Sequence, residues 1–445
     1  MSDIPEEHRV HRTGGWLPND HRIHKHWLEK TIKHVDRNPK ALHPILTEFQ
    51  HLIENDTRFY LLFNSMFDQV PHKKPYEKDP VGNRQVRDYK HMLQLLNHLM
   101  TTPPSWSNHG HSVGLVGLPF QALFDWPMAT SSGFAAFLDP QVNAILKKVL
   151  NTWGEYLKSS DSAVVLGTDT NCWFGPAGME NLTTAANVAA GTSLSFEEMF
   201  VCDPSAKHHG FTSWDNFFTR TFRVGIRPVA HPSRDEVIVN SCESLPYKVA
   251  YDVNAHDKFW IKGQPYSVLD VLAYDTLAGS FVGGTIYQAF LSSLSYHRWH
   301  SPVSGKIVKA YVKDGTYYSE PPFTSIAGPL GADTGGENRG QSYIAAVATR
   351  ALIFIEADNP DIGLMCVVLV GMVEVSTCEI TVKDGQHVQK GEQLGMTMKF
   401  HFGGSTHCLL FRKGVDIRGF PETDRKNNVP VRSELALVLS SKRAE

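Results

Sequence analysis

The sequence predicts an α+β protein, with a helical N-terminal domain in residues 1–200 and a β-rich domain in residues 205–445. Between about residues 40 and 160, apolar residues recur at the spacing of one helix face. After about residue 205, short β-branched and aromatic runs alternate with turn residues, a pattern typical of strands. A chain of 445 residues is long enough for two or three domains and a substantial core.

Three segments of the N-terminal domain have helical spacing. Their apolar residues are Ile45, Phe49, Leu52 and Ile53; Met92, Leu95, Leu96 and Leu99; and Val142, Ile145, Leu146, Val149 and Trp153. Asp139 and Pro140 favour the start of the third helix, because aspartate caps a helix and proline suits its first position. Residues 71–80 and 101–112 are predicted loops.

Seven runs in the β-rich domain are predicted strands. They are residues 237–239, 307–308, 343–346, 351–355, 365–370, 380–382 and 435–439. Residues 320–341 are dense in proline, glycine, aspartate and asparagine, which indicates a long surface loop. The longest apolar run, residues 362–373, is shorter than the roughly 20 residues that cross a bilayer, so it favours a buried strand.

The composition is that of an ordinary soluble globular protein, with 42% hydrophobic residues, 20% charged residues and a net charge of −3. The charges are scattered, so no nucleic-acid partner is expected. An acidic N-terminus without a hydrophobic core argues against a signal or transit peptide. Six cysteines without a C-x-x-C pair indicate reduced thiols, so we expect a cytoplasmic protein. His21, His24 and His26 are interpreted as solvated surface, and no metal is expected.

Residues 384–395 resemble a hairpin of lipoyl- and biotin-carrier domains, and Met398-Lys399 is similar to a biotinylation site. Carrier domains, however, place the modified lysine on an exposed tip before such a hairpin, whereas Lys399 follows it. A shared hairpin architecture is therefore favoured over a carrier function.

Two short motifs carry the candidate chemistry. In Gly403-Gly404-Ser405-Thr406, the serine hydroxyl can turn onto the preceding carbonyl, because glycine tolerates the strained backbone that such an attack needs. In the second motif, residues 296–300, two histidines three residues apart could supply proton transfers. Either motif alone is weak, since Gly-Gly-Ser is usually a turn and His-x-x-His is usually incidental.

Together, in this order, the motifs resemble those of the phosphatidylserine decarboxylase family. Residues 213–223, continuing to Arg227-Pro228, are similar to the Phe-Phe-x-Arg signature that opens the catalytic domain of that family. The resemblance spans residues 205–445. It implies self-cleavage between Gly404 and Ser405 and conversion of Ser405 into a covalent pyruvoyl group, with no pyridoxal phosphate and with the two fragments remaining associated.

The resemblance also implies roles for three further residues. His300 is the candidate base for the Ser405 hydroxyl, since an unperturbed histidine titrates near pH 6.5. Glu243 matches an aspartate of the family, one methylene longer, and would orient His300; the alternative is a surface carboxylate. His297 is associated with the decarboxylation step, or else only hydrogen-bonds the scaffold.

Three other parts of the motifs receive a plainer interpretation. Tyr296 and Trp299 line the substrate pocket or fill the core, and the core is favoured for each. Residues 213–223 are expected to pack and to pair with the scaffold, without a catalytic role.

A pyruvoyl ketone forms a Schiff base with an amine, so the substrate must carry an α-amino acid. Residues 132–137 and 150–157 resemble a soluble fungal branch of the family that includes a tryptophan decarboxylase. We therefore expect a small-molecule substrate, a free aromatic L-amino acid, with tryptophan giving tryptamine as the first candidate. The alternatives are phosphatidylserine at a membrane surface, without an integral membrane segment, and a non-catalytic binding protein that retains the fold.

Overall fold

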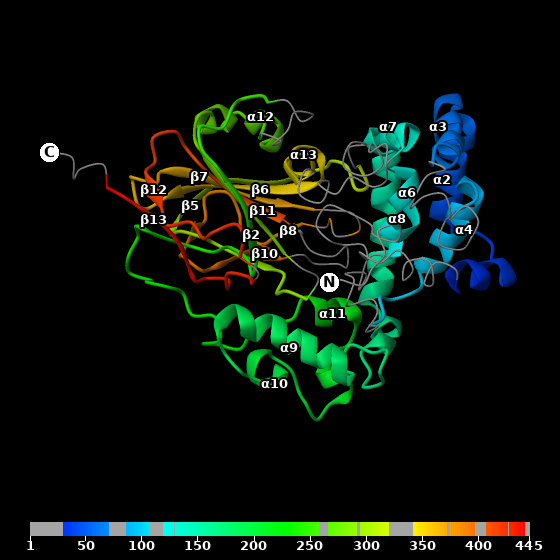
Figure 1. Cartoon of the computed structure of the whole chain (residues 1–445), viewed down its shortest axis with the longest axis horizontal. Coiled ribbons are helices and arrows are strands. Elements are labelled where there is room, and N and C mark those ends of the chain that lie inside the picture. Colours follow the sequence, from blue (N-terminus) through cyan, green and yellow to red (C-terminus); the bar gives the residue numbers. More distant parts are fainter. Residues whose placement is uncertain are drawn as a thin grey trace. The chain divides into compact units, whose positions relative to one another are not determined.

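The computed structural model describes most of the chain. The described residues are 30–70, 86–106, 119–128, 130–257, 266–291, 294–319, 341–371, 374, 376, 378–396, 406–425 and 427–440. Two compact units divide it: Met1–Gly175 with Gly315–Ile344, and Pro176–Asp314 with Ala345–Glu445 (Figure 1). The predicted division at residues 200–205 stays a prediction.

The first unit is built from helices. They are α2 (Pro44–Asn55), α3 (Thr57–Asp68), α4 (Tyr89–Leu99), α6 (Pro119–Met128), α7 (Ser131–Leu138), α8 (Pro140–Lys158) and the 3-10 helix η3 (Ser160–Val165). All three helices expected from periodicity are present, as α2, α4 and α8. Asp139 caps α8 as predicted, because its carboxylate accepts the backbone N–H of Gln141 at 2.8 Å.

The predicted loop at residues 71–80 lies outside the described residues. The predicted loop at residues 101–112 is described only over residues 101–106, which contain no helix or strand.

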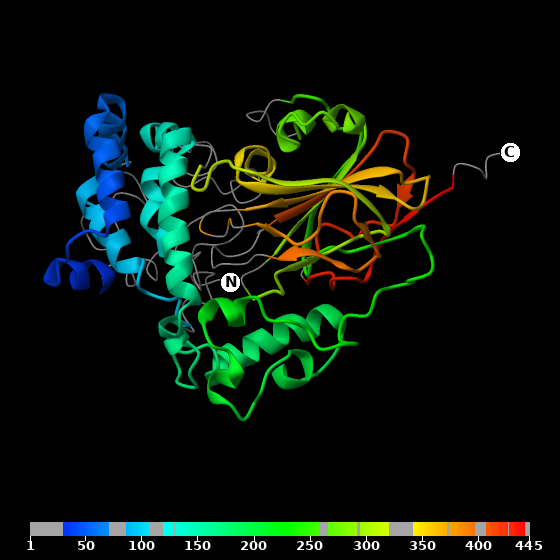
Figure 2. The same ribbon diagram turned by 180° about the vertical axis from the view of Figure 1, so that it is seen from behind.

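In its described residues, the second unit combines helices with three antiparallel sheets. Its helices are α9 (Pro176–Ala190), α10 (Phe196–Met199), η4 (Lys207–Gly210), α11 (Trp214–Phe218), α12 (Val268–Val271) and η5 (Ala278–Phe281). Helices α9, α10 and α11 lie together in both views (Figures 1 and 2). Helix α13 (Gln341–Val347) contains the point at which the chain passes from the first unit back to the second.

The largest sheet has seven strands in the order β2-β3-β11-β7-β6-β5-β9. They are β2 (Leu245–Ala250), β3 (Thr285–Phe290), β5 (Gly305–Lys313), β6 (Arg350–Ala357), β7 (Leu364–Val370), β9 (His387–Val388) and β11 (Thr406–Phe411). The central strands β6, β7 and β11 are almost entirely buried, which explains their near-continuous apolar sequences.

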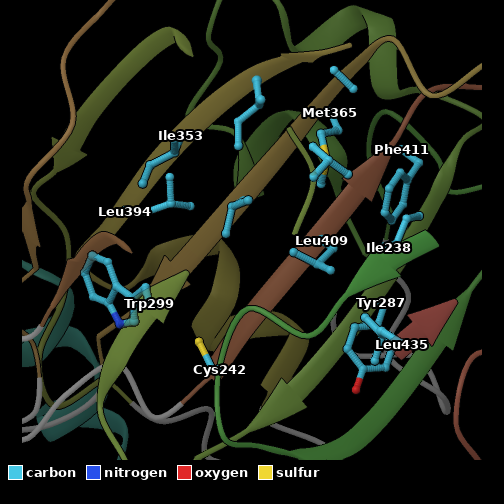
Figure 3. Packing of buried hydrophobic residues seen from close by; sticks show 14 of the residues in the cluster. Ile238, Cys242, Tyr287, Trp299, Ile353, Met365, Leu394, Leu409, Phe411 and Leu435 are labelled. Atoms are coloured by element: carbon cyan, nitrogen blue, oxygen red, sulfur yellow. The ribbon is translucent and has the colours of Figure 1, made fainter. Parts of the chain in front are cut away.

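Two three-stranded sheets complete the unit, in the orders β4-β10-β8 and β1-β13-β12. Their strands are β1 (Val237–Val239), β4 (Arg298–His300), β8 (Glu379–Ile380), β10 (Gln393–Met396), β12 (Ile417–Arg418) and β13 (Glu434–Val438). Side chains of all three sheets meet in one core cluster, among them Ile238, Trp299 and Leu409 (Figure 3). Burial of this apolar surface is what holds the sheets together.

The α+β class is confirmed, and six of the seven predicted strands contain residues of an observed strand. The exception is residues 343–346, which belong to helix α13. That prediction is wrong because short apolar runs do not distinguish strand from helix, and Ala345 and Ala346 favour the helix. The predicted loop at 320–341 lies outside the described residues except for Gln341, the first residue of α13.

The carrier-like segment, residues 384–395, contains β9 and the start of β10. Strand β9 pairs with β5, whereas β10 pairs with β4 and β8. Each of the two strands therefore pairs with strands outside this segment. Lys399 lies outside the described residues. The lysine inside the segment, Lys390, is held in the fold, because its Nζ donates to the carbonyls of His231 and Arg234 at 2.7 Å.

Candidate active site

One end of the seven-stranded sheet brings distant parts of the sequence together. Thr406, the first residue of β11, pairs with Phe290 on one side and with Val370 on the other. The same row continues to Leu245 of β2 and to Arg350 of β6. Because antiparallel strands alternate in direction, β2, β6 and β11 begin at this row while β3 and β7 end there. We call it the Thr406 end of the sheet.

The predicted cleavage site is next to this row in the sequence. Gly403, Gly404 and Ser405 lie outside the described residues, and Thr406 follows Ser405 directly. Glu243 and Ser244 immediately precede β2, and the chain leaves β3 at Phe290 six residues before Tyr296. The sheet topology therefore leads the chain from the Thr406 end to the residues that the motifs singled out.

His300 is a buried neutral histidine at the end of β4, only 2% exposed. Its Nδ1 lies 3.0 Å from the carbonyl oxygen of Gly391, which also accepts the Nε–H of Arg432 at 2.9 Å. We assign the proton to Nδ1 from this network, which leaves Nε2 as the acceptor. The hydroxyl of Tyr296 lies 3.2 Å from Nε2 and can donate to it.

The surroundings of His300 keep the imidazole uncharged. Burial, and then the positive charge of Arg432, lower the pKa of His300 to about 3. At neutral pH Nε2 is therefore unprotonated and faces the Tyr296 hydroxyl, and a backbone carbonyl contacts Nδ1 where a carboxylate often does so. Nε2 is thus available as an acceptor by geometry, while the lowered pKa makes it a weaker base than an ordinary histidine.

Glu243 is buried, at 1% exposure, so its interpretation as a surface carboxylate is wrong. Both of its oxygens bind Arg227, at 2.6 Å to Nη2 and 3.1 Å to Nε. One oxygen also accepts the backbone N–H of Val431 at 2.8 Å. In the described part of the chain, His300 contacts instead the Tyr296 hydroxyl and the Gly391 carbonyl, and the Nε of Arg432 lies 3.3 Å from its Nδ1. The expected Glu243–His300 hydrogen bond is thus replaced by a buried ion pair.

His297 lies just before β4 and is also buried. Its ring stacks on Phe218, with centroids 4.4 Å apart and planes inclined by 27°. Tyr296 packs against Phe222 at 4.6 Å, and Trp299 belongs to the core cluster, as expected. The two histidines therefore contact different groups, although only two residues separate them.

Two functional candidates escaped the sequence reasoning. His407, the second residue of β11, is fully buried, and its Nε2 lies 2.9 Å from the Ser244 hydroxyl. Burial lowers the pKa of His407 to about 3. A histidine inside the apolar run Thr406–Phe411 was the available signal. The second is Arg432, which shares the Gly391 carbonyl with His300. Its φ of +67° is rare for residues with a side chain, and no sequence pattern predicts it.

Metal and membrane features can be judged only for the described ranges. There, no group of three or more histidine, cysteine, aspartate or glutamate residues could hold a metal ion. His21, His24 and His26 lie outside these ranges. No helix within them has the length and apolar character needed to cross a membrane.

Known proteins resemble the chain over most of its length. Two family models match, both described as phosphatidylserine decarboxylase, over residues 43–182 and 214–432. Decarboxylase iboD of Amanita muscaria is 44% identical over 74% of this chain and 94% of its own. The L-tryptophan decarboxylases of Psilocybe cyanescens and Psilocybe cubensis are 36% and 35% identical over 90% of this chain, and over 88% and 89% of their own.

These relatives are matched along nearly their whole length and carry decarboxylase names, so the expectation of a non-catalytic binding protein is dropped. Taken with the family models that cover both units, they show that the chain belongs to the phosphatidylserine decarboxylase family and is a decarboxylase, a carboxy-lyase.

Proposed function

We propose that this protein is a self-processing, pyruvoyl-dependent decarboxylase of free aromatic L-amino acids, with conversion of L-tryptophan to tryptamine as the first candidate. The observation that carries the proposal is the strand register at Thr406, the residue that follows Ser405. Thr406 lies in the same row as Leu245, where β2 begins just after Glu243, and as Phe290, where β3 ends and the chain continues toward His300. The names of the two Psilocybe relatives support the substrate.

In the proposed cleavage, the Ser405 hydroxyl attacks the carbonyl carbon of Gly404 and forms an ester in place of the peptide bond. Elimination then frees residues 1–404 with a carboxylate terminus and leaves a dehydroalanine at residue 405. One water hydrolyses this group to a pyruvoyl cap and releases ammonia. His300 would accept the hydroxyl proton at Nε2, a role supported by its neutral ring and its occupied Nδ1.

The burial of the residues that follow Ser405 supports a pyruvoyl group at this position. Thr406 and His407 are 1% and 0% exposed, so residues that follow the group directly are shielded from water. When present, the group would supply a ketone that accepts electrons as carbon dioxide departs. His297 would hold the proton that the product carbon receives. Glu243 would support the site through Arg227 and the Val431 amide.

The two fragments, residues 1–404 and 405–445, are expected to remain associated after cleavage. Residues 406–411 form β11, paired with β3 on one side and β7 on the other, so removal of the C-terminal fragment would expose the middle of the sheet.

Phosphatidylserine is the second candidate substrate, because both family models carry that description. The two are distinguished by incubating the protein with L-tryptophan, L-tyrosine, L-phenylalanine or phosphatidylserine vesicles, followed by assay of carbon dioxide and amine. Release from tryptophan is expected, and Ser405→Ala should remain one chain and release none. Carbon dioxide from the vesicles alone would favour the second candidate and contradict the first.

A further inference from the structure

The segment from Phe217 to Phe222, which begins in α11, lies along the residues that carry the two histidines. Its side chains and backbone contact five consecutive residues, Leu294 to Arg298, one after another. From sequence this segment was expected only to pack against the scaffold. Its contacts show a more specific arrangement.

Two arginines fasten the segments to each other. Arg220 is 3% exposed, and its guanidinium lies over the rings of Phe200 and Phe217, 4.7 and 5.1 Å from their centroids. Its Nη2 donates to the carbonyl of Leu294 at 2.8 Å. In return, Arg298 donates to the carbonyl of Thr219 from Nη2 at 2.8 Å and from Nε at 3.0 Å.

The cost of burying Arg220 makes this contact informative. A buried charge is tolerated only when hydrogen bonds compensate the lost water. In the described structure, the Arg220 guanidinium donates to the backbone carbonyls of Leu294 and Ser295, just before His297, and lies over two aromatic rings. These contacts replace the water that the buried charge has lost. Its charge is therefore used to fix the backbone that leads into His297.

One aromatic ring of the segment contacts His297 directly, and a second reaches His300 through Tyr296. Phe218 stacks directly on His297. Phe222 packs on Tyr296, whose hydroxyl contacts Nε2 of His300. Phe222 also stacks on Phe200, with centroids 4.7 Å apart, and the Arg227 guanidinium lies 4.4 Å from its centroid. Each ring therefore restricts one histidine of the pair.

We propose that residues 217–222 are a positioning template that sets the two histidines independently: Phe218 aligns His297 for decarboxylation, and Phe222 aligns Tyr296 and His300 for self-cleavage. The proposal rests on the proposed function, from which it takes the two steps. Phe218 and Phe222 are positioning residues, since each acts through another side chain.

The test compares Phe218→Leu with Phe222→Leu. Cleavage is followed on denaturing gels of freshly made protein, and kcat and KM are measured on the cleaved fraction. Phe218→Leu should cleave at the wild-type rate and lose about tenfold or more in kcat at nearly unchanged KM, because small misplacements of a reacting group are costly. Phe222→Leu should cleave about tenfold more slowly, with a normal kcat once cut. Phe218→Tyr and Phe222→Tyr should restore each step.

Phe211→Leu is the matched control, because Phe211 is a buried ring that packs on Phe196 and Phe217 of the same aromatic cluster. The template is overturned if both variants lose cleavage rate and kcat equally, or if their cleavage rates and kcat values match those of Phe211→Leu. Cleavage and carbon dioxide release by the wild-type protein would still support the proposed function. If the wild-type chain neither cuts nor releases carbon dioxide, the proposed function and the template both fail.

Discussion

At the residue scale, the two histidines of the motif are held by different partners although only two residues separate them. His300 is fixed through Nδ1 by the Gly391 carbonyl and keeps Nε2 as an acceptor, whereas His297 is held by ring stacking on Phe218. The sequence indicated both residues, but it could not supply their partners, because these come from segments about 80 to 130 residues away.

The two histidines are therefore expected to fail at different steps when replaced. His300→Ala should block cleavage, because the Ser405 hydroxyl loses its proton acceptor. His297→Ala should still cut but decarboxylate slowly, by the ~10²–10⁴-fold typical of a lost acid–base group. Gels and carbon dioxide release measure the two steps. Efficient processing by His300→Ala would refute its role.

Glu243 illustrates where residue-level prediction stops. Its position in the sequence suggested a partner for His300, but a planar guanidinium fork satisfies both carboxylate oxygens, and Arg227 lies in reach. Which cation or imidazole a buried carboxylate meets is decided by packing between segments, and no local pattern records it.

Removing one partner of this buried pair should be costly. Glu243→Leu leaves the Arg227 charge uncompensated and is expected to lower the free energy of unfolding by about 3–5 kcal/mol. The double variant Glu243→Leu/Arg227→Met should lose less than the sum of the single changes, because no lone charge remains. Urea denaturation of all four proteins measures this. A Glu243→Leu protein as stable as wild type would contradict the assigned ion pair.

At the element scale, the turn between β9 and β10 positions a catalytic candidate through its backbone. Gly391 has a φ of +80°, and its carbonyl accepts hydrogen bonds from His300 and Arg432. Its own N–H donates to Ser301, the residue that follows His300. The resemblance to a carrier hairpin thus marks a real turn, whose observed contacts serve the candidate active site.

Gly391→Ala is expected to slow self-cleavage. The new Cβ would meet Val229 at 2.4 Å and strain the left-handed backbone, so the carbonyl that fixes His300 must move. Gly385→Ala is the matched control in the same segment, because its φ is +84° but its Cβ meets nothing within 4 Å. Cleavage rates on denaturing gels measure the effect. Equal rates for the two variants would contradict a role for the Gly391 carbonyl.

Elements differ in how well the sequence predicts them. Helices α2, α4 and α8 were predicted from periodicity, because each buries one face and exposes the other. Helix α13 was missed, since its seven residues are too few to show a period. The strand β11 was not predicted at all, although its first residue follows Ser405, the serine proposed for cleavage.

At the scale of the whole molecule, the sheet register creates the candidate site. Strands β2, β3, β11 and β7 come from positions as much as 161 residues apart (Leu245 and Thr406), yet one row aligns their ends. Such non-local pairing depends on how the whole core packs, so a single sequence indicates which strands exist but not which are neighbours.

Buried histidines also make the stability of the whole molecule depend on pH. The pKa values of His300 and His407 are lowered to about 3, chiefly by burial, whereas the unfolded chain titrates near 6.5. Below about pH 6.5 the unfolded state binds protons that the folded state does not. Their stabilisation is therefore complete above pH 6.5 and is lost as the pH falls toward 3, by about 1.4 kcal/mol per pH unit for each histidine.

Urea denaturation between pH 7 and 4.5 measures this slope. His407→Val should reduce the slope of the free energy of unfolding against pH by nearly the value for one proton, about 1.4 kcal/mol per pH unit, because one buried histidine has been removed. His51→Val serves as the control, since the exposed ring of His51 meets water in both states. An unchanged slope for His407→Val would show that His407 does not enter the folded core uncharged.

The central claim is that residue 405 becomes a ketone when the chain cuts itself, and mass spectrometry of the C-terminal fragment tests it most directly. Mature, active enzyme is treated with hydroxylamine, and the fragment of residues 405–445 is isolated under denaturing conditions. We predict that its first residue has the mass of a pyruvoyl group, lacks a free amine and takes up one equivalent of the reagent. An ordinary serine at that terminus, or an uncut chain in active enzyme, would contradict the account.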